Sequence, residues 1–204
     1  MSKDIEHRRI NFREADFRSK DKMIKLYDKN WEYRDVTPDT ADFAQFLDDR
    51  IQGNAGTRTI YTDCGLHRVR MHTDFYVAYE ASSMARPGSF LGFCAIQHKF
   101  ELTLYPRYEK PPFEFEIPWF LIAETTNWSV ADIADAMLRA LLAERACPPY
   151  VSAVWAYDFG VRPQGAWWPA CLERAGFVPV EKDLQRYEPE DYHDYTVTGY
   201  KLSL

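Results

Sequence analysis

Apolar residues recur at intervals of three and four along several stretches of the chain, which is the spacing of an amphipathic helix. The first helix is predicted from an apolar stripe made of Met23, Ile24, Tyr27 and Trp31. The second begins at Thr37-Pro38, because proline suits a first helical turn, and ends at Gly53-Asn54. Residues 129–146 form the clearest helical pattern, and residues 167–175 form a short one that Gly176 ends.

Apolar runs without helical spacing predict the strands. They cover residues 9–12, 57–62, 66–71, 75–80, 90–100, 113–124, 150–156, 177–180 and 195–202. Pro118 lies inside the run 113–124 and has no N–H for a strand ladder, so we expect a bulge or an unpaired stretch there. Neither a repeat nor a linker interrupts this order, which predicts a single domain over residues 1–204.

The composition is that of a globular protein: 46% of the residues are hydrophobic and 27% are charged, with a net charge of −6. Nucleic-acid binders usually carry a basic excess, because neutralising phosphates supplies much of their affinity, so this charge argues against that class. The four cysteines are far apart in sequence, which argues against a metal site and suits a reducing compartment. With a polar N-terminus and no apolar run long enough to span a membrane, we expect a cytoplasmic protein.

Three stretches occur in an informative order. Strands 75–80 and 90–98 are joined by a turn; strand 113–124 leads through a short loop into helix 129–146; and a late helix ends in Ala175-Gly176-Phe177. In this order they resemble the GNAT acyltransferase superfamily. The resemblance implies an α+β fold, with a mixed, mostly antiparallel sheet flanked by helices on both faces. Residues 1–70 would supply a variable strand and two helices, and residues 71–204 the core with the cofactor loop.

In that family, two central strands splay apart to admit the pantetheine arm of acyl-CoA, and the next helix holds the pyrophosphate. A helix N-terminus suits an anion because its unpaired N–H groups carry a partial positive charge. The resemblance therefore places acetyl-CoA or another acyl-CoA against Ala123, Ser129, Val130, Ala131 and Ala134.

Three positions depart from the family pattern, and the first is Ser129, which replaces an arginine or glutamine of the pyrophosphate loop. Asp132 replaces the central glycine of the pyrophosphate loop, and its carboxylate would repel a diphosphate. Ser129 and Asp132 also match a capping box, in which the helix satisfies its own first donors. Leu172 stands where many members have a tyrosine that protonates the departing thiolate.

Acyl transfer to an amine needs a base for the nucleophile and donors for the developing oxyanion. Glu124, at the end of the predicted strand 113–124, is the first candidate for the base. Tyr157 follows the next strand and would supply the proton that Leu172 cannot, and His98 is a third candidate because histidine titrates near neutral pH. The adjacent Trp167 and Trp168 cannot be buried equally on one helix.

Three functions follow from these patterns. The first is an N-acyltransferase that moves an acyl group from acyl-CoA to a small-molecule or protein amine. The second is a protein that keeps the fold without the cofactor and acts as a binding or inhibitory module, which the changes at Asp132 and Leu172 favour. The third is a modifier of nucleobases, against which the acidic net charge counts.

Overall fold

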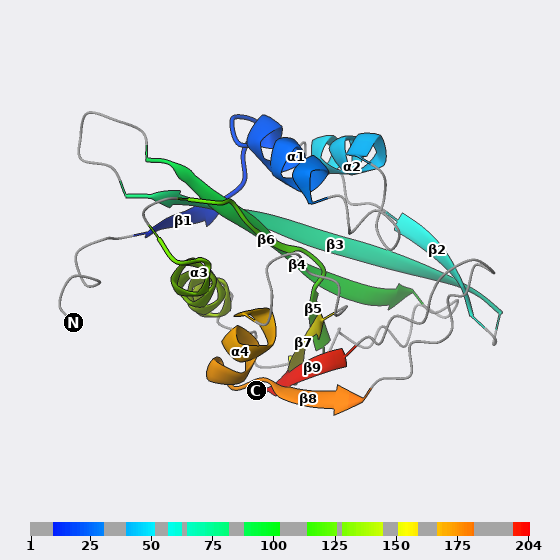
Figure 1. The fold of residues 1–204 in the computed structure, drawn as a ribbon. Helices are drawn as coiled ribbons and strands as arrows, with labels where there is room; N and C mark the ends of the chain where they lie inside the picture. Colours follow the sequence, from blue (N-terminus) through cyan, green and yellow to red (C-terminus); the bar gives the residue numbers. More distant parts are fainter. Residues whose placement is uncertain are drawn as a thin grey trace, which may run out of the picture.

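A single mixed β-sheet with helices on both faces organises the protein, as a computed structural model shows (Figure 1). The structure describes residues 10–30, 40–51, 57–62, 65–81, 88–102, 114–125, 128–144, 151–158, 167–181 and 198–204. The strands within these ranges are β1 (Ile10–Glu14), β2 (Thr57–Thr62), β3 (Gly65–Glu80), β4 (Phe90–Leu102), β5 (Glu114–Ile117), β6 (Phe120–Ile122), β7 (Ala153–Asp158), β8 (Val178–Glu181) and β9 (Thr198–Ser203). The helices are α1 (Lys20–Lys29), α2 (Thr40–Ile51), α3 (Val130–Glu144) and α4 (Trp167–Arg174).

The strands follow the order β1-β3-β4-β5-β7-β9-β8, with β2 paired to β3 and β6 paired to β4. Strands β5 and β7 pair in parallel, and the other described pairs are antiparallel. Helices α1 and α2 cover one face of the sheet, and α3 and α4 cover the other (Figure 1). The α+β architecture expected from the resemblance is therefore confirmed.

Each face of the sheet has its own core, because successive side chains of a strand point to opposite sides. The core under α1 and α2 is aromatic: the ring of Phe43 stacks on Tyr27 at 3.9 Å, and Trp119 stacks on Phe75 at 5.5 Å. The core under α3 and α4 contains Phe115, Ile117, Phe120, Ile133, Met137, Leu141 and Trp168, all buried.

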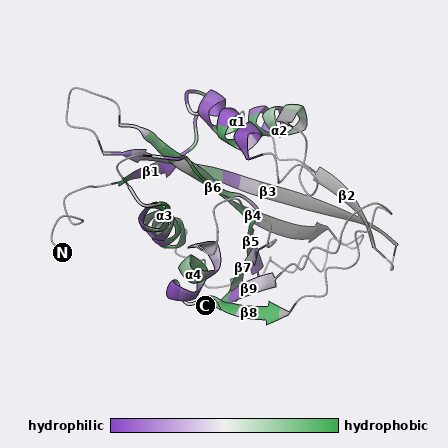
Figure 2. Ribbon diagram, viewed as in Figure 1, coloured by the Kyte–Doolittle hydropathy of each residue, from purple (hydrophilic) through white to green (hydrophobic). Residues whose placement is uncertain are grey.

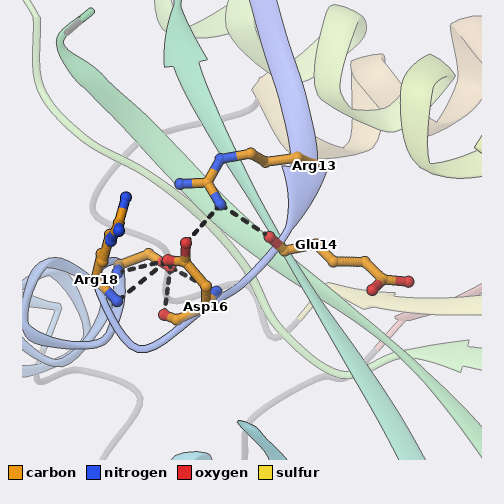
Figure 3. Close-up of polar contacts among 5 residues, drawn as sticks. Arg13, Glu14, Asp16 and Arg18 are labelled. Atoms are coloured by element: carbon orange, nitrogen blue, oxygen red, sulfur yellow. Dashed lines mark hydrogen bonds and ion pairs between the residues drawn. The ribbon is translucent and has the colours of Figure 1, made fainter.

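The turn between β1 and α1 is fastened by Asp16 (Figure 3). Its carboxylate accepts hydrogen bonds from the backbone N–H groups of Arg18 and Ser19 and from the guanidinium of Arg13, the last at 2.9 Å. A short polar side chain that bonds to the backbone two or three residues ahead stabilises a turn. This turn fixes the point at which α1 begins to cross the sheet.

Hydropathy differs between a helix that covers the sheet and a strand at its edge (Figure 2). Helix α1 is mostly hydrophilic, with the buried Met23, Leu26 and Tyr27 on its inner side. The edge strand β8 is hydrophobic, and Val178 on it is 61% exposed. No helix within the described ranges is long and apolar enough to cross a membrane.

One expected break in the sheet is absent. Residues 66–71 and 75–80, predicted as separate strands, form the single strand β3, so that prediction is wrong. The intervening residues 72–74 pair in register with residues 96–98 of β4. This pairing satisfies the backbone N–H and C=O groups of a polar stretch whose sequence resembles a turn. Other boundaries differ by a few residues, and the predicted Trp31, Thr37-Pro38 and Gly53-Asn54 features lie outside the described residues.

Candidate active site

Strands β6 and β7 diverge in the middle of the sheet. Below the divergence, β5 pairs with β4 on one side and in parallel with β7 on the other, ending with the pair Ile117 and Ala156. Pro118 and Trp119 then interrupt the strand, and β6 continues along β4. Within the described ranges β6 pairs with β4 and not with β7, so the break expected at Pro118 is confirmed and opens the sheet between two central strands.

The backbone of β6 turns alternate groups toward the divergence. The N–H of Ala123 donates to the carbonyl of Leu91 at 2.8 Å, and the carbonyl of Trp119 accepts from the N–H of Ala95 at 2.9 Å. Because backbone groups alternate in direction along an antiparallel strand, the N–H and C=O of Phe120 and Ile122 point away from β4, toward the side of β7. Ala123, a predicted cofactor contact, therefore directs its own N–H to β4.

Helix α3 begins beside the far end of β6. The Ser129 hydroxyl accepts the N–H of Asp132 at 3.1 Å, which confirms Ser129 as an N-cap. The N–H groups of Val130 and Ala131 precede the first bonds that the helix can supply internally, so they face outward at its end. Asp132 is exposed in the first turn, and Ala134 is fully buried against the sheet.

A carboxylate and a phenol meet at the base of the divergence. The hydroxyl of Tyr157 on β7 donates to Oε1 of Glu116 on β5 at 3.2 Å. Their neighbours Phe115, Ile117 and Ala156 are buried under α3 and α4, so the pair lies on the opposite face, the side of α1 and α2. Burial, and then the negative charge of Glu116, raises the pKa of Tyr157 well above its ordinary value.

Glu124 lies beyond β6 and forms an ion pair with Lys29 of α1, with 2.6 Å between Nζ and Oε2. Its side chain is 79% exposed, and the hydrogen bond from Lys29 lowers its carboxyl pKa. Glu124 is therefore an ionised surface group that is a weaker base than an ordinary glutamate.

The remaining predicted residues lie elsewhere in the fold. His98 lies in β4, opposite Phe115 of β5, and the structure does not describe its side chain. Leu172, at the position of the family's tyrosine, is fully buried in the core under α4. Trp168 is fully buried while Trp167 is partly exposed, so the expected difference in burial between the two side chains is confirmed.

Glu116 is a candidate that was not predicted from the sequence. The run Glu114-Phe115-Glu116-Ile117 alternates acid and apolar residues, which puts both carboxylates on one face of a strand. Glu114 binds Trp155 and Lys201, at 2.9 Å and 3.1 Å, whereas Glu116 contacts Tyr157. The signal in the sequence was that Glu116 is the acid of this alternating run that lies closest to Pro118.

No protein-family model and no curated protein matches the sequence. Solved structures resemble the fold instead. The spermidine N-acetyltransferase from Vibrio cholerae, in complex with CoA and spermine, has a TM-score of 0.58 and 10% identity, over 95% of each chain. An acetyltransferase of the GNAT family from Streptococcus pneumoniae has a TM-score of 0.55 and 10% identity, over 96% of this chain and all (100%) of that one.

RimL, a ribosomal L7/L12 alpha-N-protein acetyltransferase in complex with coenzyme A, has a TM-score of 0.53 and 14% identity, over 96% of this chain and 94% of its own. These similarities extend along nearly the whole chain and not only over one motif. The chain therefore has the fold of the GNAT acetyltransferases.

Proposed function

We propose that the protein is an N-acyltransferase that moves an acyl group from acyl-CoA to an amine. The observation that carries the proposal is the divergence of β6 and β7. The N-terminus of α3 follows β6 on one side of it, and the Glu116–Tyr157 pair lies at its base. Similar folds are solved with CoA and act on a small polyamine or on a protein amine. Both kinds of acceptor suit this proposal.

The backbone offers groups of the right kind for acyl-CoA. The outward groups of Phe120 would pair with an amide of the pantetheine arm, as an added strand would. The N–H groups of Val130 and Ala131 at the start of α3 would hold the pyrophosphate. When bound, acyl-CoA supplies an activated acyl group with a thiolate leaving group. The N–H of Phe120 is the first outward donor beyond Pro118, which suits it to hold the acyl oxygen.

Glu116 and Tyr157 would manage the protons. Glu116 would accept the proton that the attacking amine releases, and Tyr157 would donate its hydroxyl proton to the leaving sulfur. Because Tyr157 already bonds to Glu116, the proton taken from the amine can return to the phenol, and the pair is restored. Leu172 can transfer no proton, and this arrangement does not require it to.

The proposal is tested by comparing two carboxylates. Glu116→Gln should lower kcat by about 100-fold or more, the usual contribution of a general base, while leaving the affinity for acetyl-CoA unchanged. Glu124→Gln, which alters an exposed ion pair, should leave kcat nearly unchanged. Thiol release from acetyl-CoA would be followed with polyamines and with peptides that have a free N-terminus.

If Glu124→Gln abolishes turnover and Glu116→Gln does not, the base is the residue first predicted at the strand end, and our assignment of Glu116 is wrong. If no acceptor is acylated and calorimetry detects no acetyl-CoA binding, the alternative of a non-catalytic binding module is supported. The exposed carboxylate of Asp132 at the start of α3 is the observation that favours this alternative.

A further inference from the structure

The two tryptophans that open α4 lie where β6 and β7 diverge. Trp168 contacts both strands: its ring lies 4.6 Å from that of Phe120 on β6, and its Nε1 donates to the carbonyl of Tyr157 on β7 at 3.1 Å. The first turn of α4 is therefore fastened to both sides of the divergence, on the face that α3 also covers.

Trp167 lies beside this fastening. Its ring is 5.7 Å from that of Trp168 and 6.5 Å from that of Phe120. Its Nε1 is buried, and the described part of the chain offers it no hydrogen-bond acceptor. A buried donor without a partner costs about 1–3 kcal/mol, and most such groups in proteins are paired. Within the described ranges this donor is therefore an exception, and an acceptor brought by a ligand would satisfy it.

Trp119 also has a buried Nε1 without an acceptor in the described residues, but its surroundings differ. Its ring packs among Phe43, Phe46 and Phe75 in the aromatic core under α2, at distances of 5.5–5.8 Å. That core is filled by the chain itself. Trp167, in contrast, contacts Phe120, whose backbone faces the divergence.

We infer that Trp167 is a positioning residue for acyl-CoA, and that its indole N–H donates a hydrogen bond to the pantetheine arm. This inference rests on the proposed function. An indole N–H donates but does not ionise in the working pH range, so Trp167 would fix the arm, and the proton transfers would remain with Tyr157. The role places a donor on the first turn of α4, whereas Leu172 provides none at its own position.

The test uses the indole N–H as its own reporter. The chain has six tryptophans, so protein carrying ¹⁵N-tryptophan gives a small set of indole signals, and Trp167→Phe identifies the one that belongs to Trp167. Addition of CoA should move this signal downfield, as a new hydrogen bond does. Adenosine 3′,5′-bisphosphate, which lacks the pantetheine arm, should leave it in place.

Affinity provides a second measurement. Trp167→Phe keeps the ring and removes the donor, so it should weaken CoA binding about 3- to 10-fold, the value of one hydrogen bond, without weakening binding of adenosine 3′,5′-bisphosphate. Trp155→Phe is the matched control, because the Trp155 indole already donates to Glu114 at 2.9 Å, and it should not change CoA affinity.

The outcomes separate the inference from the function. If calorimetry shows CoA binding while the Trp167 signal stays in place, Trp167 does not contact the arm and the inference is overturned, with the proposed function intact. If CoA does not bind, both fail. If Trp167→Phe does not fold, the signal is assigned through substitutions of the other tryptophans, and the wild-type titration decides.

Discussion

Tyr157 carries a proton that the fold holds in place. Its pKa lies above the ordinary value because of burial and, second, because of the charge of Glu116. An ordinary tyrosine ionises near pH 10, so above about pH 10 the unfolded chain loses this proton while the native protein keeps it. The native state then binds more protons than the unfolded state, and stability must fall as the pH rises.

We therefore expect the free energy of unfolding to fall more steeply with pH in the wild type than in Tyr157→Phe, above about pH 10. The two slopes should differ by up to about 1.4 kcal/mol per pH unit. Below that pH the difference between the two proteins should be constant. Urea denaturation at a series of pH values between 8 and 11, roughly spanning the tyrosine range, measures it. Parallel curves through the whole range would mean that the Tyr157 pKa is ordinary.

Individual residues differ in how far the sequence predicts them. Tyr157 could be named as a candidate because it adjoins the predicted strand 150–156, which the structure extends to include it. Glu116 could not be chosen over Glu114 or Glu124, because the choice depends on the register between β5 and β7 and on the contact of Glu124 with Lys29. Neither pairing leaves a local signal, since the partners are far apart in the chain.

At the scale of elements, the boundaries that were predicted best are those at residues with special backbone or capping properties. Pro118 predicted the break between β5 and β6, Ser129 predicted the start of α3, and Gly176 predicted the end of α4. Gly176 has a φ of 92°, and the N–H groups of Gly176 and Phe177 bond back to Glu173 and Leu172, as at many helix C-termini. The continuity of β3 could not be predicted, because β4 supplies the partners of its polar middle.

The start of α3 makes a specific prediction about charge. The Asp132 carboxylate stabilises the helix end, by about 0.3–1 kcal/mol, but opposes a diphosphate at the same place. Asp132→Asn should therefore lower the stability slightly and raise the affinity for acetyl-CoA several-fold, with a gain that shrinks as salt is added. Calorimetric titration with acetyl-CoA at two ionic strengths measures the affinity and its dependence on salt, and urea denaturation measures the stability.

Glu173→Gln, which removes an exposed carboxylate from the end of α4, is the control and should change neither the helix nor the affinity. An equal gain from both substitutions would mean that general negative charge, and not Asp132 at the helix end, weakens binding.

Strand β6 depends on a glycine in its neighbour. A Cβ on Gly92 of β4 would lie 2.3 Å from the carbonyl oxygen of Leu121, and the backbone there has a φ of 156°. Because the obstacle is backbone, β6 itself would have to move. Gly92→Ala should cost about 3 kcal/mol or more, in the range of severe strain, and should abolish acetyl-CoA binding.

Gly176→Ala provides the comparison, because its φ is also positive but the nearest described atom to a Cβ there is Leu202 Cδ1, at an ordinary contact distance of 3.5 Å. It should cost about 1–2 kcal/mol, the usual strain of this conformation, and should spare ligand binding. Chemical denaturation and calorimetry compare the two variants; equal losses would show that the approach of β6 to Gly92 is not tight.

At the scale of the whole molecule, the sheet has two unequal parts. One contains β1, β2, β3, β4 and β6, and the other contains β7, β9 and β8. They are joined through β5, which has four residues and meets β4 in the register pairs of Gln97 with Glu116 and His98 with Phe115. Trp168 adds a second link through its contacts with Phe120 and Tyr157.

β5 is therefore a narrow connection between two larger parts of the sheet. The core under α3 and α4 continues across it, because that core contains Phe120 of β6 together with Ala156 of β7, so a change in the separation of these strands would disturb it. A molecule that contacted both β6 and β7 would add a further link and would restrict the relative motion of the two parts. A second molecule, arriving on the face of Glu116, would then meet a surface already ordered, so the donor and the acceptor would bind with positive cooperativity and in a preferred order.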